Sequence, residues 1–132
     1  MKVNFAIVAK NAFTDSDGRL SIIQVIETIR TASFPAIHPE LVVVSRIKLD
    51  SKKAVSQSTE IVHSDSGQIL VKSEPADMEV SQKKGIQFIS TFIGLRFNKP
   101  GIYHINIKIN QKKLLKVTEF VVCKYALEKE RK

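Results

Sequence analysis

Hydrophobic and polar residues alternate along much of the chain, and this period of two is typical of β-strands whose two faces meet different surroundings. The clearest example covers residues 102–110, where one face is apolar and the other polar. The apolar face carries Tyr103, Ile105, Ile107 and Ile109, and the polar face carries His104, Asn106, Lys108 and Asn110. Residues 41–44 are apolar on both faces, which indicates a strand in the middle of its sheet.

Eight such segments are separated by turn residues, and no long amphipathic helix interrupts them. The pattern predicts an all-β fold, a two-sheet antiparallel β-sandwich of immunoglobulin-like type with about eight strands. We expect one domain over residues 1–123 and a charged tail over 124–132. The last three strands are predicted to form a meander, and the polar strand 54–63 to lie near a sheet edge. The predicted strands are residues 3–8, 20–29, 41–49, 54–63, 68–72, 86–97, 102–110 and 114–122.

The composition is that of a folded globular chain, because 43% of its 132 residues are hydrophobic and 26% are charged. The longest apolar runs are far shorter than the roughly 20 residues that a membrane-spanning helix needs. We expect no signal peptide at the N-terminus, and the single cysteine, Cys123, cannot form an internal disulfide. We therefore expect a cytoplasmic protein with no membrane partner.

Positive charge is concentrated in the second half of the chain. Lys and Arg outnumber Asp and Glu by eight in the whole sequence but only by one in residues 1–66. This asymmetry indicates either an anionic partner or a solvated face that keeps the protein soluble. Residues 80–118 contain no acid and eight basic residues, which are Lys83, Lys84, Arg96, Lys99, Lys108, Lys112, Lys113 and Lys116.

No motif for catalysis or cofactor binding is present. The histidines, His38, His63 and His104, do not form a metal-binding spacing, and no glycine-rich phosphate loop occurs. We expect His104 to form hydrogen bonds on the polar face of its strand and the other two to be solvated. The protein is predicted not to be an enzyme and to bind no cofactor and no metal.

The acidic residues leave alternatives open. Residues 15–18 (DSDG) begin like a calcium loop, but no acid follows until Glu27, so a turn is favoured over a metal site. Glu27, Glu60 and Glu119 fall on predicted strands. There they could meet as a carboxylate pair, or they could pair with Lys and Arg across neighbouring strands.

The basic stretch provides the one candidate binding surface. Along residues 86–97 we assign to the core face Ile89, Thr91, Ile93, Leu95 and Phe97, and to the outer face Phe88, Ser90, Phe92, Gly94 and Arg96. If this outer face continues into the polar face of residues 102–110, rings and cations alternate there, as on surfaces that bind proteins or single-stranded nucleic acid. Alternatively, a loop or a second copy covers the two phenylalanines. The predicted partner-binding residues are Phe88, Phe92, Arg96, His104, Lys108, Lys112, Lys113 and Lys116.

Several segments together resemble a family of small bacterial proteins of unknown function. They are residues 3–9 (VNFAIVA), residues 17–22 (DGRLSI), Pro35 and Pro39 before an apolar strand, and residues 99–103 (KPGIY). The similarity extends from residue 1 to about residue 122. It implies a single-domain β-sandwich and transfers no catalytic residue.

Three functions remain open from the sequence. The first is an accessory or regulatory module that binds another protein through the basic sheet face, or by strand addition at the edge 54–63. The alternative is nucleic-acid binding through the basic region 80–118. The third is an enzyme whose site is assembled from distant residues. A homo-oligomer is compatible with each of them.

Overall fold

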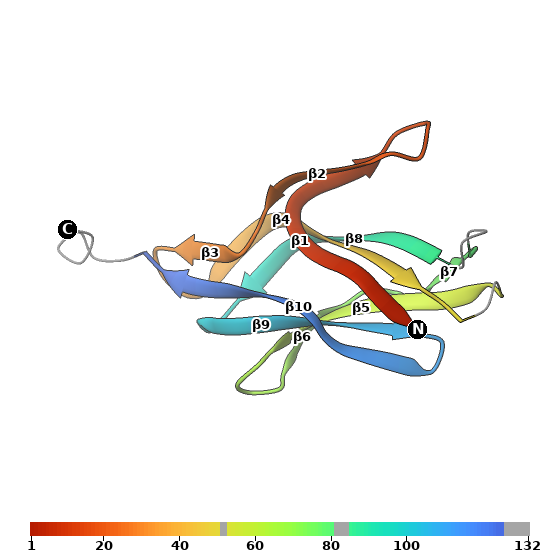
Figure 1. Cartoon of the computed structure of the whole chain (residues 1–132). Helices are drawn as coiled ribbons and strands as arrows, with labels where there is room; N and C mark the ends of the chain where they lie inside the picture. The colour runs from red at the N-terminus through yellow and green to blue at the C-terminus, as the bar shows by residue number, and fades with distance from the viewer. Residues whose placement is uncertain (51–52, 81–84, 126–132) are drawn as a thin grey trace.

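The computed structural model describes residues 1–50, 53–80 and 85–125, which form ten β-strands (Figure 1). Within these ranges no helix is long and apolar enough to cross a membrane. The strands are β1 (Lys2–Thr14), β2 (Leu20–Val25), β3 (Thr28–Thr31), β4 (Ala36–Lys48), β5 (Val55–His63), β6 (Ile69–Lys72), β7 (Ala76–Met78), β8 (Gly85–Phe97), β9 (Gly101–Ile109) and β10 (Lys112–Lys124).

The strands form two stacked sheets. Sheet A has the order β2-β1-β4-β8, and sheet B has the order β3-β10-β9-β5-β6, with β7 also paired to β5. Neighbours are antiparallel except β3 and β10, which are parallel. The predicted all-β, two-sheet sandwich is therefore confirmed, with ten strands in place of about eight. The two additional strands, β3 and β7, contain only four and three residues, too few for a period to be recognised.

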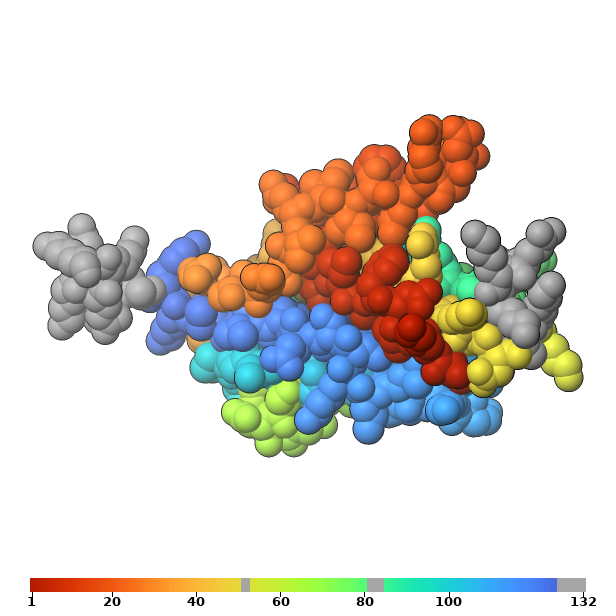
Figure 2. Space-filling view, viewed as in Figure 1, coloured from red at the N-terminus to blue at the C-terminus, as the bar shows by residue number. Residues whose placement is uncertain are grey.

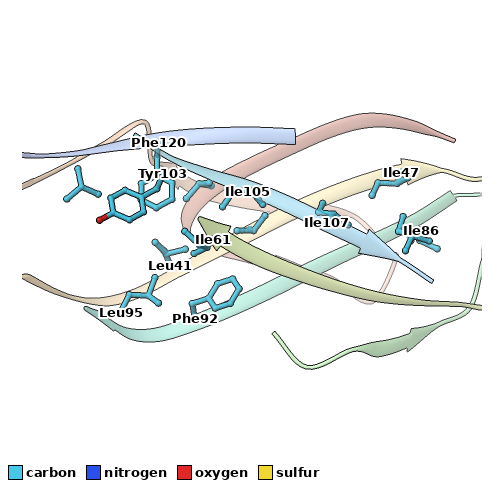
Figure 3. Packing of buried hydrophobic residues seen from close by; sticks show 14 of the residues in the cluster. Leu41, Ile47, Ile61, Ile86, Phe92, Leu95, Tyr103, Ile105, Ile107 and Phe120 are labelled. Carbon is cyan, nitrogen blue, oxygen red and sulfur yellow. The ribbon is translucent and has the colours of Figure 1, made fainter. Parts of the chain in front are cut away.

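The main apolar core lies between the sheets (Figure 3). The predicted alternation on β9 is confirmed, since its odd-numbered residues from Tyr103 to Ile109 are at most 2% exposed. The Tyr103 ring lies 5.0 Å from the Phe97 ring and 5.7 Å from the Phe120 ring, measured between centroids. Its hydroxyl donates a hydrogen bond to the carbonyl oxygen of Lys99 at 2.6 Å, so its polar end is satisfied inside the core.

The position of β4 between β1 and β8 confirms that it is central. Leu41 and Val43 face the main core, whereas Val42 and Val44 belong to a second apolar cluster on the outer side of sheet A. The β1–β2 hairpin, which curves back in Figure 1, contributes side chains that cover this cluster. The second cluster consists of Ala9, Ala12, Val42 and Val44, with Phe5, Leu20, Ile22 and Ile89 packed against it.

Two predictions about strand connections are wrong. Residues 20–29 divide between β2 in sheet A and β3 in sheet B. The expected meander holds only for β9 and β10, because β8 pairs with β4 in sheet A. The turn before β9 carries the chain from one sheet to the other, and it needs glycine at position 101. Gly101 has a φ of 133°, and a Cβ there would lie 3.0 Å from Nε2 of His63.

The polar strand β5 is internal, contrary to prediction. It pairs with β9 along one edge and with β6 and β7 along the other, so strand addition at residues 54–63 is excluded as a binding mode. Its polar side chains instead reach across the core. Gln57 donates to Oγ of Ser45 at 3.3 Å, and the hydroxyl oxygens of Thr59 and Ser90 lie 2.9 Å apart. These buried hydrogen bonds between the layers explain the polar composition.

Candidate functional site

The predicted partner-binding residues do not lie on one face. Phe88, Phe92 and Arg96 belong to β8 in sheet A, whereas His104 and Lys108 on β9 and the three lysines of β10 belong to sheet B. The outer faces of the two sheets point to opposite sides of the sandwich. The expected surface of alternating rings and cations therefore does not form, because the turn before β9 separates its two halves.

The face assignment on β8 is also wrong for its first part. Phe92 is 5% exposed and packs in the main core (Figure 3), Phe88 is half-buried, and Ile93 is 78% exposed. The cause is Gly94, whose φ of 65° reverses the alternation of side chains along the strand. Residues before Gly94 therefore face the core at even positions, and those after it, such as Leu95, at odd positions. The Phe92 ring is therefore not available to a partner, and Phe88 is only partly exposed.

Arg96 is exposed on β8, and its Nε donates to Oδ1 of Asn98 at 3.1 Å. It belongs to the other sheet from the basic residues of β9 and β10. Lys83 and Lys84, which the basic stretch also includes, lie outside the described residues, as do residues 126–132 of the predicted tail.

Basic side chains do gather on the outer face of sheet B. Glu60 on β5 pairs with Asn106 on β9 along one edge of its strand and with Lys72 on β6 along the other. On the far side of β9, Lys108 pairs with Lys113 on β10. We call Lys72, Lys108 and Lys113 the lysine cluster. These residues come from β6, β9 and β10 and line one small cavity of about 50 Å³, whose lining is completed by Ser58, Glu60 and Asn106.

Glu60 lies at the base of the lysine cluster, and only 6% of its side chain is exposed. Its Oε1 is 2.6 Å from Nζ of Lys113 and accepts a hydrogen bond from Nδ2 of Asn106 at 3.3 Å. Its Oε2 is buried, and no described residue donates a hydrogen bond to it. Burial alone would raise the pKa of Glu60, but the bonds from Lys113 and Asn106 and the charge of Lys72 lower the pKa below its ordinary value. The carboxyl group is therefore ionised at neutral pH.

Asn106 connects Glu60 to an irregularity in β10. The pairing of β9 with β10 shifts between Leu114 and Thr118, and Lys116 has a φ of 50°. The backbone N–H of Lys116 donates to Oδ1 of Asn106 at 2.9 Å. One amide side chain thus satisfies the bulge with its oxygen and Glu60 with its nitrogen, which fixes the position of both.

His104 is buried on the same face, 8% exposed, where a surface histidine was expected. Its Nδ1 lies 2.8 Å from the hydroxyl oxygen of Ser64. Burial and the charge of Lys116 lower the pKa of His104, although Glu119 and Glu60 act in the opposite direction. The ring is therefore neutral at neutral pH, and its role here is structural hydrogen bonding. His63 is likewise buried, with Ser66 and Pro100 as hydrogen-bonding partners, where a solvated ring was expected.

A polar groove of about 280 Å³ adjoins the small cavity and shares three residues with it, Ser58, Lys72 and Lys108. It runs toward the β9–β10 turn and the segment before β7. Its other lining residues are Ser56, Pro75, Asn110 and Gln111. Lysine ammonium groups, amides and hydroxyls therefore dominate a continuous recess, a lining suited to an extended polar ligand of negative charge.

Two further expectations have clear outcomes. Residues 15–18 form the predicted turn, in which Oδ1 of Asp15 accepts the backbone N–H groups of Asp17 and Arg19, each at 2.9 Å. The carboxylates of Asp15 and Asp17 also form ion pairs with Arg19.

Of the acids that could pair across strands, Glu60 does so with Lys113. Cys123 is half-buried on β10.

The chain matches a known protein family. A model described as a family of unknown function (DUF6941) covers residues 4–122, from within β1 to within β10. The chain belongs to this family. Glu60 and the lysine cluster thus lie inside the DUF6941 domain. A search of curated proteins finds no match.

Lys72 and Asn106 of this candidate site are not among the predicted partner-binding residues, and Glu60 was predicted only as an acid that could pair with another carboxylate or with Lys and Arg. Lys72 lies before the basic stretch, and its proximity to Lys108 depends on the pairing of β6 with β5 and of β5 with β9. The available signal was the alternation on β9, which places Asn106 and Lys108 on one face together with His104.

Proposed function

We propose that this protein is a non-enzymatic binding module that holds an acidic segment of a partner protein on the outer face of sheet B. The lysine cluster would bind carboxylates of the partner, and the adjoining groove would hold its backbone. The cluster and Glu60 together carry a net charge of about +2 at neutral pH. This surplus supports an anionic ligand and disfavours a basic one.

The observation that carries the proposal is the buried Oε2 of Glu60, which accepts no hydrogen bond from any described residue. A buried carboxylate oxygen of this kind is stabilised by a ligand that brings an N–H or O–H donor. A polypeptide supplies both required groups, because backbone N–H donors alternate with acidic side chains. The sugar–phosphate backbone of DNA supplies acceptors only, so a nucleic acid would have to supply the donor from a base or from the 2′-hydroxyl of RNA. This difference supports a protein partner over the alternative of nucleic acid.

The absence of stacking rings also supports a protein partner. Single-stranded nucleic acids are commonly bound by exposed aromatic side chains on a basic sheet. Phe92 is buried in the main core and Phe88 is half-buried on sheet A, and on the described part of sheet B the rings of Tyr103 and Phe120 are buried in the core. The lysine cluster can neutralise phosphates, but it has no aromatic surface beside it on which bases could stack.

The test compares a labelled polyglutamate peptide with a single-stranded oligonucleotide of equal charge, by fluorescence anisotropy. The K72Q/K108Q variant should lose about tenfold in peptide affinity, while K10Q/K99Q, which removes the same charge elsewhere, should lose much less. The E60Q variant separates the two partners. It should weaken binding of the peptide, whose N–H donor loses a charged acceptor, and should not weaken binding of the oligonucleotide, because the repulsion that E60Q removes acts on both anions. Equal losses in the two double variants would refute the site.

A further inference from the structure

A second recess lies on the opposite side of the molecule, between the β1–β2 hairpin and the outer face of sheet A. The tip of this hairpin stands away from the body of the protein in Figure 2. The cleft has a volume of about 590 Å³, within the range of about 300–1,000 Å³ that is usual for small-molecule sites. Its lining consists of Asn4, Gly18, Arg46, Lys48, Gly85, Ile86 and Gln87.

The guanidinium group of Arg46 is positioned by two neighbours. Its Nε and Nη2 both donate to Oε1 of Gln87, the first at 3.1 Å. Its central carbon lies 5.3 Å from the centre of the Phe5 ring. Gln87 in turn donates from Nε2 to Oγ1 of Thr14 on the hairpin at 3.4 Å. The arginine is therefore fixed in orientation between the sheet and the hairpin, although it remains exposed.

The charge of Arg46 is not neutralised within the described ranges, where neither Arg46 nor Lys48 forms an ion pair. The acids nearest along the hairpin, Asp15 and Asp17, are engaged by Arg19. Gln87 occupies the Nε side of the guanidinium, so the edge formed by Nη1 and the second hydrogen of Nη2 remains for a ligand. That edge presents two parallel N–H donors, the geometry that binds two oxygens of a phosphate or carboxylate.

We propose that this cleft binds the phosphate group of a small phosphorylated molecule. Arg46 would bind two phosphate oxygens through its remaining edge, and Lys48 would supply the second positive charge that a dianionic phosphate monoester needs. The amide of Asn4, which also lines the cleft, is a donor for the third oxygen. The cleft is much larger than one phosphate group, so the ligand carries a polar body beside it. This site is independent of the one on sheet B.

The proposal is tested with inorganic phosphate, AMP and succinate as probes, using amide shifts in ¹H–¹⁵N NMR spectra. Phosphate and AMP should shift the resonances of Gly18 and Gln87, with AMP binding more tightly because it fills more of the cleft. Succinate, a dianion without a phosphate group, should bind at least about tenfold more weakly than phosphate. The R46Q variant should lose about tenfold in phosphate affinity, and K48Q somewhat less.

The R30Q variant is the matched control, because Arg30 is exposed on β3 and away from the cleft. R30Q should bind phosphate as tightly as the unmodified protein. Unfolding of R46Q would be recognised from its spectrum, and K48Q would then decide the question alone. The proposal would be overturned if R46Q and K48Q each bound phosphate as tightly as the unmodified protein. Shifts spread over lysines throughout the surface would also overturn it. Succinate binding as tightly as phosphate would also overturn it.

Discussion

Nζ of Lys113 lies 2.6 Å from Oε1 of Glu60, and the second oxygen of the same carboxylate is buried without a hydrogen-bond donor from the described residues. One oxygen of the carboxylate thus binds Lys113 of the lysine cluster, and the other is the oxygen that we propose accepts a hydrogen bond from the partner. Because Lys113 is 46% exposed while Glu60 is 6% exposed, the ammonium group can also reach a partner on the surface. This arrangement links the stability of the sheet to its proposed binding function.

Removing the carboxylate should destabilise the protein. The E60A variant leaves Nδ2 of Asn106 without its partner and the lysine cluster without its counter-charge, so we expect a loss of about 1–3 kcal/mol in the free energy of unfolding. Urea denaturation at pH 7 measures this loss. The control is E119A on β10, an exposed position in the same sheet where a change within about 0.5 kcal/mol is expected. Similar losses in both variants would contradict a special role for Glu60.

As the pH is lowered from neutral, the stability of the protein should decrease first through protonation of His104 and then through protonation of Glu60. Burial and Lys116 lower the pKa of His104 from the ordinary value of 6.5, so the unfolded chain binds this proton more readily. The contribution of His104 to the free energy of unfolding should therefore be fully present above about pH 6.5 and should decrease as the pH falls below it. The lowered pKa of Glu60 adds a second loss below about pH 4.5, as the carboxyl group takes up a proton.

Denaturation curves recorded between pH 8 and pH 3 would check this order. The H104Q variant should lack the part of the first decrease that His104 causes. His38, whose pKa burial also lowers, should retain its share in that variant. A profile for H104Q that matches the unmodified protein throughout would show that His104 is not the group responsible.

The reversal of side chains on β8 should be visible in two adjacent substitutions. F92A removes a ring from the main core and should cost about 3–5 kcal/mol. I93A changes a side chain that is 78% exposed and should change the free energy of unfolding by about 0.5 kcal/mol or less. Urea denaturation of both variants provides the comparison. The opposite order would restore the face assignment expected from simple alternation.

Gly94 should be required for its backbone conformation and not for space. A Cβ at this position would meet no atom within 4 Å, but the φ of 65° is unfavourable for alanine. We expect G94A to lose about 1–2 kcal/mol in the free energy of unfolding. G94N should lose less, because asparagine adopts this conformation more readily. If alanine and asparagine proved equally well tolerated, the strain argument would fail.

The periods of the sequence predict the layers of this fold better than they predict its surfaces. The alternation from Tyr103 to Ile109 correctly identifies the core face of β9, and the apolar residues 41–44 identify the central strand β4. Counting by two fails on β8, because Gly94 adopts a positive φ that reverses the phase, and a glycine within a strand permits such an irregularity without specifying it. Polar β5 was placed at an edge because its hydrogen bonds across the core depend on sheet A, which local sequence does not encode.

The candidate site was predicted in part. His104 and Lys108 lie on the outer face of sheet B as the period of their strand indicates, whereas Lys113, expected just before the predicted strand 114–122, lies at the start of β10. Lys72 and Glu60 join them through strand pairings between distant parts of the chain, which no local pattern specifies. The aromatic residues of β8 were placed on the same surface only because β8 and β9 are consecutive in sequence. In the structure they belong to different sheets.

NMR mapping of a bound polyglutamate peptide tests the central claim most directly, because it reports where on the protein an acidic segment binds. The proposal predicts that amide shifts concentrate on β5, β6, β9 and the start of β10, with the largest changes beside Glu60, Lys72 and Lys108. These shifts should decrease as salt is added. Shifts concentrated on sheet A, or spread evenly over all exposed lysines, would contradict it.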